Sequence, residues 1–255
     1  MRFYKYHAAG NDFIITDDLA VTSADAPHLC NRSTGIGADG ILLCRPSTRG
    51  EARMVVINAD GSIAAMCGNG LRCFCRYLVE QCGIGKENFH VETDAGLYSC
   101  SVRRDNDGWY ITVDLGTAVV CDEPFPSRWR VAIGNNHLVA LGPSDEREAR
   151  ETALRLKEEY GGKLNVEVVR SIDHLRRVIE LVVNERGVGF TAACGTGGAA
   201  VTAALHHAGV LGMGEEWALW FPGGALCYRI DGEGRILMTG DAVFVFSGDT
   251  DVPAH

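Results

Sequence analysis

The chain has 255 residues, of which 46% are hydrophobic, so it is long enough and apolar enough to bury one large core or two of medium size. Its formal net charge is -9, which argues against a nucleic-acid partner because such a protein needs a basic face. The first residues lack the apolar core of a signal peptide, and no later stretch approaches a membrane span. We therefore expect a cytoplasmic protein with no membrane partner.

Apolar alternation with a period of two dominates the first half and predicts strands at 13–16, 41–44, 54–58, 97–102 and 110–115. A helix is predicted after Gly70, and Gly83 is placed to end it. Its apolar positions recur at helical spacing: Leu71, Phe74, Leu78, Val79 and Cys82.

The second half repeats this mixture. A helix is predicted over 144–160, with acidic residues first and Lys157 late, and we expect it to cover the surface. An alanine-rich helix should end at Gly209. Strands are predicted at 175–183, 226–230, 236–240 and 243–246.

Four short patterns recur in the same order and at a nearly constant offset. The pairs are Gly10-Asn11-Asp12-Phe13 with Gly134-Asn135-Asn136-His137, Asn58-Ala59-Asp60-Gly61 with Asn184-Glu185-Arg186-Gly187, Met66–Gly70 with Ala193–Gly197, and Gly96 with Gly224. Four collinear matches predict a duplicated fold with lobes 1–118 and 119–255. No linker composition marks the boundary, so we expect the lobes to pack directly together.

The third pattern places a thiol and two glycines at each predicted strand-to-helix junction, in Cys67-Gly68-Asn69-Gly70 and Cys194-Gly195-Thr196-Gly197. Glycines let the backbone approach a ligand, and the first N–H groups of a helix attract an anion. A thiol at a helix amino terminus is also biased toward the reactive thiolate. Each turn is therefore a candidate carboxylate site with a reactive sulfur beside it.

Two equivalent lobes would bring both thiols to one cleft, on opposite sides of a substrate carbon. One thiolate would remove the α-proton and the other thiol would deliver a proton to the far face, which inverts the centre. This chemistry needs no pyridoxal phosphate, other cofactor or metal. A zinc site is disfavoured because the cysteines form no C-x-x-C pair. We expect the other cysteines to be free thiols that act mainly as small core residues: Cys30, Cys44, Cys73, Cys75, Cys82, Cys100, Cys121 and Cys227.

The motifs GNDF at 10–13, GIGADG at 35–40, NADGS at 58–62, MCGNGLRCF at 66–74, NERG at 184–187, ACGTG at 193–197, FPGG at 221–224 and MTG at 238–240 resemble those of the diaminopimelate epimerase family, in order. The resemblance spans nearly the whole chain. It implies an α/β (α+β) fold of two pseudo-symmetric lobes, each a curled mixed sheet around a central helix, with the active site between them.

By the same resemblance, the chain is a cofactor-independent isomerase that converts LL- to meso-diaminopimelate for lysine and peptidoglycan precursor biosynthesis, and forms a homodimer. Its catalytic residues would be Cys67 and Cys194. The reacting α-carboxylate would be held by Gly68, Asn69, Gly195 and Thr196. The distal end would be bound by Asn58, Asn135, Asn165 and Arg186, with Asn11 and Glu185 nearby.

Three positions depart from the family pattern: Gly40 stands where Gln is usual, Asn136 where Pro is usual and Phe190 where Glu is usual. A racemase of another amino acid, such as histidine, is therefore an alternative. A second alternative is a non-catalytic amino-acid binding protein on the same fold, although such a protein has no need for two thiols.

Overall fold

The structure is a computed structural model that describes residues 1–106 and 108–251. Its contacts divide the chain into two units. Unit 1 combines Met1–Val113 with the segment that begins at Gly240, and unit 2 is Asp114–Thr239. Many strands and few helices give the expected mixed α+β fold. In the described part of the chain, no helix has both the length and the apolar character needed to cross a membrane.

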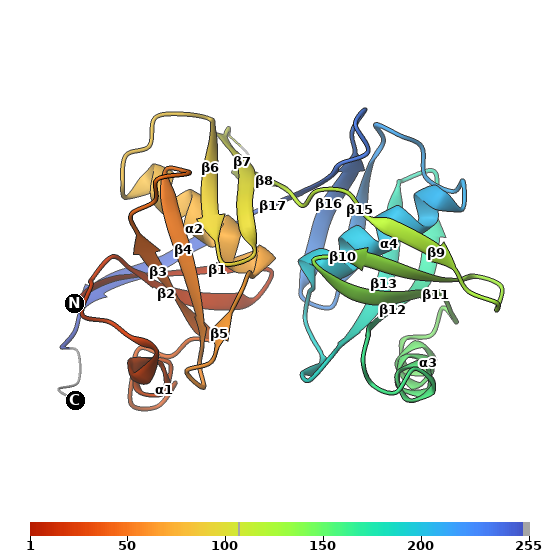
Figure 1. Ribbon diagram of the computed structural model, residues 1–255, viewed down its shortest axis with the longest axis horizontal. Helices are drawn as coiled ribbons and strands as arrows, with labels where there is room; N and C mark the ends of the chain where they lie inside the picture. The colour runs from red at the N-terminus through yellow and green to blue at the C-terminus, as the bar shows by residue number, and fades with distance from the viewer. Residues whose placement is uncertain (107, 252–255) are drawn as a thin grey trace. The chain divides into compact units, whose positions relative to one another are not determined.

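Unit 1 contains most of the elements of the first half (Figure 1). These are β1 (Arg2–Ala8), β2 (Asn11–Thr16), the 3₁₀ turn η1 (Ser23–Asp25), α1 (Ala26–Leu29), β3 (Gly40–Arg45), β4 (Ala52–Asn58), β5 (Ile63–Ala64), α2 (Gly68–Glu80), β6 (Asn88–Thr93), β7 (Gly96–Arg104), β8 (Trp109–Asp114) and β18 (Val243–Asp249).

Unit 2 holds the remaining elements (Figure 1). These are β9 (Val119–Asp122), β10 (Arg128–Ile133), β11 (Asn135–Leu141), α3 (Glu146–Glu159), β12 (Asn165–Asp173), β13 (Val178–Glu185), β14 (Gly189–Phe190), α4 (Gly195–His207), β15 (Glu216–Phe221), β16 (Gly224–Ile230) and β17 (Ile236–Gly240).

The strand pairings of the two units follow the same sequence. In unit 1, β1–β2 is antiparallel, β2–β3 parallel, β3–β4 antiparallel, β4–β6 parallel, and β6–β7 and β7–β8 antiparallel. In unit 2, β10–β11, β11–β12, β12–β13, β13–β15, β15–β16 and β16–β17 pair with the same senses. The central helix of each unit packs on its strands in the same way: α2 on β1, β2, β4 and β7, and α4 on β9 to β12 and β16. In unit 2, α3 also packs on β12 and β13. The internal repeat of the sequence therefore corresponds to two units with the same order and sense of strand pairing.

The division at 118/119 that the sequence predicts differs from the observed units. The chain leaves unit 1 after Val113 and returns to it at Gly240. The reason is strand pairing, because β18 runs antiparallel to β1, with Arg2 opposite Asp249 and His7 opposite Val243. The final strand therefore completes the N-terminal sheet.

Helix α2 buries the apolar positions that the sequence predicts, except Val79, which is half-buried, and Cys82. Leu71, Phe74 and Leu78 of α2 are buried. The helix ends earlier than the pattern suggests, because Gln81 caps it and Gly83 takes the left-handed conformation with φ of 73°. Cys82 therefore lies in the turn beyond the helix and is exposed, so its prediction as a core residue is wrong. The same prediction is wrong for Cys121, which is exposed on β9.

Candidate active site

The two cysteine turns have the same local geometry. Cys67 is the N-cap of α2, with φ −139° and ψ 118°, and its Sγ accepts a hydrogen bond from the Gly70 N–H at 3.4 Å. Cys194 is the N-cap of α4, with φ −131° and ψ 114°, and its Sγ accepts from the Gly197 N–H at 3.3 Å. Each sulfur thus takes the place that a serine or aspartate oxygen usually holds at a helix start.

The first N–H groups of each helix have no partner within the helix, because the residues before them are not helical. In α2 these groups belong to Gly68 and Asn69, and in α4 to Gly195 and Thr196. The side chain of Asn69 is buried, and its Oδ1 accepts a hydrogen bond from the fully buried Arg72 at 3.0 Å. Asn69 therefore offers its backbone N–H to an anion while its side-chain oxygen anchors Arg72.

The surroundings of Cys194 contradict the expectation of a thiolate at this turn. The side chain is 7% exposed. Burial raises the pKa of the Cys194 thiol well above its usual value, and the charges of Glu185 and Glu167 raise it further, against hydrogen bonds from Thr196 and the Gly197 N–H. Desolvation and the two carboxylates thus outweigh the helix terminus and favour the thiol form of Cys194.

A fully buried pair, His137 and Glu167, lies beneath the start of α4. His137 Nδ1 is 2.8 Å from Glu167 Oε1, and both side chains have no exposed surface. A Cβ added to Gly197 would come within 2.8 Å of the same carboxylate oxygen, so this glycine allows α4 to approach it. Burial lowers the pKa of His137, but Glu167 outweighs it and the net pKa is raised.

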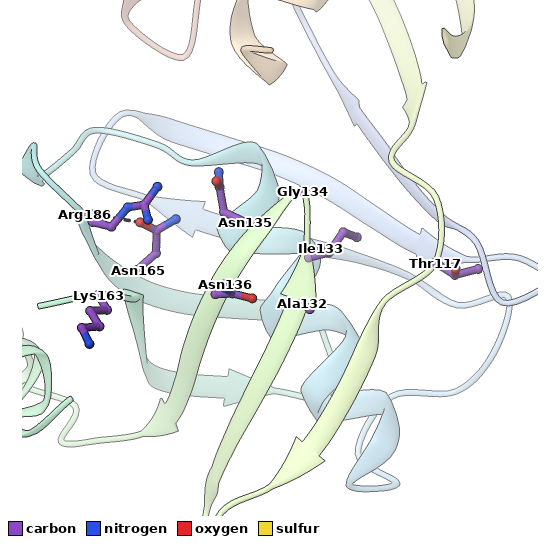
Figure 2. A pocket seen from close by; sticks show the side chains of 9 residues that line it. All are labelled: Thr117, Ala132, Ile133, Gly134, Asn135, Asn136, Lys163, Asn165 and Arg186. Carbon is purple, nitrogen blue, oxygen red and sulfur yellow. Dashed lines mark hydrogen bonds between the residues drawn. The ribbon is translucent and has the colours of Figure 1, made fainter. Parts of the chain in front are cut away.

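Three of the residues predicted to bind the distal end of the substrate line a cavity of about 350 Å³ in unit 2. Asn135, Asn165 and Arg186 gather at one end of it (Figure 2). Asn165 Oδ1 accepts a hydrogen bond from the Arg186 N–H at 2.8 Å, which fixes the backbone of the arginine while its exposed guanidinium stays free to bind. The remaining lining residues are Thr117, Ala132, Ile133, Gly134, Asn136 and Lys163.

This cavity adjoins the Cys194 turn. Gly134, which lines it, has φ of 64°, and a Cβ at this position would lie 3.0 Å from the Thr196 methyl group. Thr196 Oγ1 is in turn 3.6 Å from Cys194 Sγ. The candidate sites for the two ends of one substrate are thus connected through Thr196.

Hydrogen bonds from α3 stabilise the turn that carries Arg186. Lys157 of α3 donates from Nζ to the Asn184 side chain, and to the Glu185 carbonyl at 2.7 Å. The Glu185 carboxylate accepts a hydrogen bond from Thr191 Oγ1 at 2.6 Å. The predicted surface helix α3 therefore also supports the candidate site.

In unit 1, the predicted residues Asn11 and Asn58 lie at the ends of neighbouring hairpins. Asn11 follows a tight turn in which Ala9 and Gly10 both have positive φ, and its buried Oδ1 has no partner among the described residues. Asn58 is exposed and its Nδ2 donates to Ser62 Oγ at 2.9 Å.

An ion network fixes the Asn11 turn. Asp12 accepts two hydrogen bonds from Arg32, at 3.0 and 2.8 Å, and pairs with Lys5 at 2.7 Å. Arg32 also reaches Asp39 in the GIGADG loop, at 2.8 Å. Arg32 thus links the GNDF and GIGADG motifs through Asp12 and Asp39.

The three departures from the family pattern have distinct surroundings. Gly40 is packed so closely that an added Cβ would meet the Ile57 carbonyl oxygen at 2.6 Å, so no larger residue fits this backbone. Asn136 lines the cavity. The Arg150 guanidinium lies over Phe190, with its central carbon 4.7 Å from the centre of the ring, and Phe190 does not line the cavity.

Sequence reasoning missed three buried or part-buried side chains at the site: His137, Glu167 and Lys157. His137 stood in the repeated Gly134–His137 pattern, which is a signal that could have been followed. Glu167 interrupts the apolar run of β12, and a charged residue in a buried strand is itself a signal. No local sequence pattern indicates a role for Lys157 at the site.

Comparison with known proteins agrees with this geometry. The diaminopimelate epimerase family model matches residues 3–121 and 130–245. A diaminopimelate epimerase of Thermobifida fusca is 37% identical over 100% of this chain and 99% of its own length, and one of Carboxydothermus hydrogenoformans is 34% identical over 98% and 99%.

Solved structures share the fold. A predicted epimerase of Pseudomonas aeruginosa has a TM-score of 0.75 at 15% identity, over 98% of each chain. A hydroxyproline epimerase of Agrobacterium vitis has a TM-score of 0.71 at 15% identity, over 97% of this chain and 90% of that one. From the family match and the near full-length relatives, the chain belongs to the diaminopimelate epimerase family.

Proposed function

We propose that this chain interconverts LL- and meso-diaminopimelate without pyridoxal phosphate or metal, by exchanging the α-proton between Cys67 and Cys194. The observation that carries the proposal is the matching N-cap geometry of the two sulfurs. A packing role for one cysteine gives no reason for the second turn to repeat the same backbone conformation and the same N–H to sulfur bond. The proposal requires both turns to reach one α-carbon.

The helix termini supply the stabilisation that the reaction needs. Removal of an α-proton leaves negative charge that spreads into the neighbouring carboxylate. The free N–H groups of Gly68 and Asn69, and of Gly195 and Thr196, are donors suited to that carboxylate, and the helix dipoles add to their effect. Oriented donors of this kind usually contribute more than the proton-transfer groups themselves.

The protonation state of Cys194 orders the steps. The raised pKa of Cys194 favours its thiol form, so in one direction of the reaction Cys194 is the proton donor and Cys67 the base, and in the reverse direction the two exchange roles. Cys67 takes the α-proton, and Cys194 delivers its proton to the other face of the carbanion. The product is inverted, Cys67 is then a thiol and Cys194 a thiolate, and exchange with water restores the starting state.

The cavity in unit 2 is suited to the second amino-acid end of diaminopimelate. Arg186 can form two parallel hydrogen bonds to a carboxylate, and the amides of Asn135 and Asn165 provide further polar groups. We propose that Asn58, Asn11 and Glu185 complete recognition of this end. An imidazole has no carboxylate to place there, so the cavity favours diaminopimelate over histidine.

We further propose a cytoplasmic, homodimeric enzyme that works in lysine and peptidoglycan precursor synthesis. None of the ten cysteines, all of them in the described part of the chain, forms a disulfide, which suits a reducing compartment. On β18, the apolar side chains Val245 and Phe246 are exposed, and such a surface suits contact with a second copy. Light scattering after gel filtration tests the dimer.

Incubation in deuterated water tests the activity. Purified protein, with no cofactor or metal added, should remove the α-proton NMR signal of LL-diaminopimelate and form the meso isomer. The Cys67→Ala variant is the control. Exchange of histidine with none of diaminopimelate would reassign the substrate, whereas tight binding without any exchange would identify a binding protein.

A further inference from the structure

Unit 2 has a second cavity, of about 450 Å³, at the C-terminal end of α4, the opposite end from Cys194. Val120 of β9, Ile230 of β16 and Ile236 of β17 supply aliphatic walls, and His206 lines the cavity from α4. A cavity of this size, with apolar walls and a few polar groups, can hold a small organic molecule. The residues that line it have no part in the proposed reaction.

The helices of the internal repeat show which residue of unit 1 corresponds to this place. Helices α2 and α4 each have 13 residues, and each follows a cysteine N-cap. Arg76 is the ninth residue after Cys67, and Ala203, which lines the cavity, is the ninth after Cys194. A long cationic side chain in unit 1 is therefore matched by a methyl group in unit 2.

The edge strands add a second pair of matching positions. Phe244 of β18 lies opposite Tyr6 of β1, and Val120 of β9 lies opposite Val131 of β10. Tyr6 and Val131 hold the same place, two residues before the end of their strands. Phe244 thus corresponds to Val120, and the larger side chain is again in unit 1.

The last hairpin of each sheet supplies a third pair. Ile111 of β8 lies opposite the seventh residue of β7, and Ile236 of β17 lies opposite the seventh residue of β16. Two residues before them stand Trp109 and Gly234, and Gly234 lines the cavity. Unit 2 therefore has Ala, Val and Gly at the places where unit 1 has Arg, Phe and Trp.

In unit 1 these larger side chains pack together. The central carbon of the Arg76 guanidinium lies 4.8 Å from the centre of the Trp109 ring and 5.8 Å from that of Tyr6. Phe244 packs on the Tyr6 ring at 5.3 Å between centres. Arg76 Nη1 donates a hydrogen bond to the Ala242 carbonyl at 2.6 Å, and only 12% of the Arg76 side chain is exposed. A planar cation, attracted by the faces of aromatic rings, therefore fills this place.

The acceptor of this cation has a counterpart in unit 2. Ala118 lines the cavity and stands two residues before Val120, as Ala242 stands two residues before Phe244. The Ala118 carbonyl thus corresponds to the carbonyl that accepts from Arg76. The methyl side chain that replaces the arginine in unit 2 cannot donate to it.

The electrostatics of the cavity favour a cation. The last carbonyl groups of α4 and the negative end of its dipole lie at this end of the helix. His206 Nδ1 is 2.8 Å from the Leu211 carbonyl oxygen, so Nδ1 carries a proton and Nε2 of the neutral ring is an acceptor. The Asp122 carboxylate lies 3.2 Å from Nε2 of His207, the helix residue that corresponds to Glu80. A cation with N–H donors suits these groups, whereas a carboxylate does not.

We propose that this cavity is a binding site for a small aromatic cation, a molecule with a planar amidinium or guanidinium group on a flat apolar body. Its ring takes the space that Trp109 and Phe244 take in unit 1. Its cationic group donates to the Ala118 carbonyl as Arg76 donates to the Ala242 carbonyl. The site is separate from the candidate active site and goes beyond the proposed function.

Titration with benzamidine tests the proposal, because this probe joins a phenyl ring to an amidinium. The NMR signals of isotope-labelled isoleucine methyl groups are followed in the full-length protein. We expect saturable ring-current shifts at Ile230 and Ile236, with a Kd of about 1 mM or lower, and none at Ile14 or Ile41 in the core of unit 1. Benzoate has the same shape and the opposite charge, and should bind at least about tenfold more weakly.

Two variants copy residues of unit 1 into unit 2. Ala203→Arg supplies a guanidinium from the chain itself, and Val120→Phe independently supplies an aromatic ring. Each should weaken benzamidine binding at least about tenfold, because it fills the place of the ligand. Ala208→Arg, at the exposed C-cap of α4, is the matched control and should change Kd by less than about twofold. Circular dichroism checks that each variant is folded.

Three results would overturn the proposal. The first is the absence of shifts at Ile230 and Ile236 up to about 10 mM benzamidine. The second is benzoate binding as tight as benzamidine binding, which would leave an apolar cavity with no preference for a cation. The third is unchanged affinity in both folded variants, Ala203→Arg and Val120→Phe, which would place the probe elsewhere. These readouts do not depend on epimerase activity, so their failure leaves the proposed function untouched.

Discussion

Lys157 Nζ lies 2.7 Å from the backbone carbonyl oxygen of Glu185, so a side chain of α3 holds the turn that presents Arg186 to the cavity. Lys157→Met keeps the length of the side chain but removes both hydrogen bonds. We expect KM for diaminopimelate to rise about 10-fold with a smaller change in kcat, because one or two bonds of about 1 kcal/mol each are lost.

Steady-state kinetics and urea unfolding measure this change. Lys157→Arg should restore part of the affinity, and Arg147→Met, on the same helix with a side chain that is 79% exposed, is the matched control. A purely structural role would lower the free energy of unfolding and leave KM as it is.

Replacement of either cysteine should stop epimerisation. Cys67→Ala and Cys194→Ala should each reduce kcat by at least about 100-fold, because inversion needs a proton-transfer group on both faces of the carbon. Cys121→Ala is the control and should retain activity, and circular dichroism checks the fold. Either variant keeping a tenth of the activity would refute the two-thiol mechanism.

Replacement of Arg186 tests recognition of the distal carboxylate. Arg186→Lys keeps the charge but loses the two-pronged contact, so KM should rise about 10-fold or more. Arg176→Lys, an exposed change of the same chemistry in unit 2, should have no effect. Unchanged kinetics in the Arg186→Lys variant would remove this residue from the site.

Asp12 should make stability depend on acidic pH. Burial raises its pKa, but hydrogen bonds from Arg32 and Lys5 outweigh burial and lower it below the usual value. A carboxyl whose folded pKa is depressed adds stability above the unfolded pKa of about 3.9, and this stability is lost as pH falls through the folded pKa. The protein should therefore lose this stability in the acidic range below about pH 5.

Urea unfolding at pH 7 and at pH 3 checks this. Asp12→Asn should lower the free energy of unfolding by about 2 kcal/mol at pH 7. The difference in this free energy between the wild type and the variant should be smaller at pH 3. Asp249→Asn, at a side chain that is 73% exposed, is the control. If this difference in free energy of unfolding is the same at both pH values, the charge of Asp12 does not contribute to stability.

Much of the fold could be predicted because it is encoded locally. The spacing of glycines around Cys67 and Cys194 sets the two helix starts, and period-two alternation sets most strands. The internal repeat then predicted that the halves share one fold, and the strand pairings agree. The cavity residues Asn135, Asn165 and Arg186 were named through the family resemblance.

What could not be predicted depends on distant contacts. The raised pKa of Cys194 depends first on its burial and then on the charges of Glu185 and Glu167, and all three arise only in the folded chain. Cys82 fits a helical stripe in sequence but lies beyond the helix, because Gln81 and Gly83 end it early. The assignment of β18 to the first unit depends on pairing with β1, which no local pattern records.

That last pairing has a consequence for synthesis on the ribosome. Unit 2 is one continuous stretch, Asp114–Thr239, and can fold as soon as it has emerged. Unit 1 must wait until β18 has been made, because this strand supplies Phe244 and Phe246, whose rings pack on Tyr6 and Phe3, respectively. The first strands of unit 1 are therefore made before unit 2 but completed after it, and the β1 edge stays open to unwanted pairing until β18 has been made.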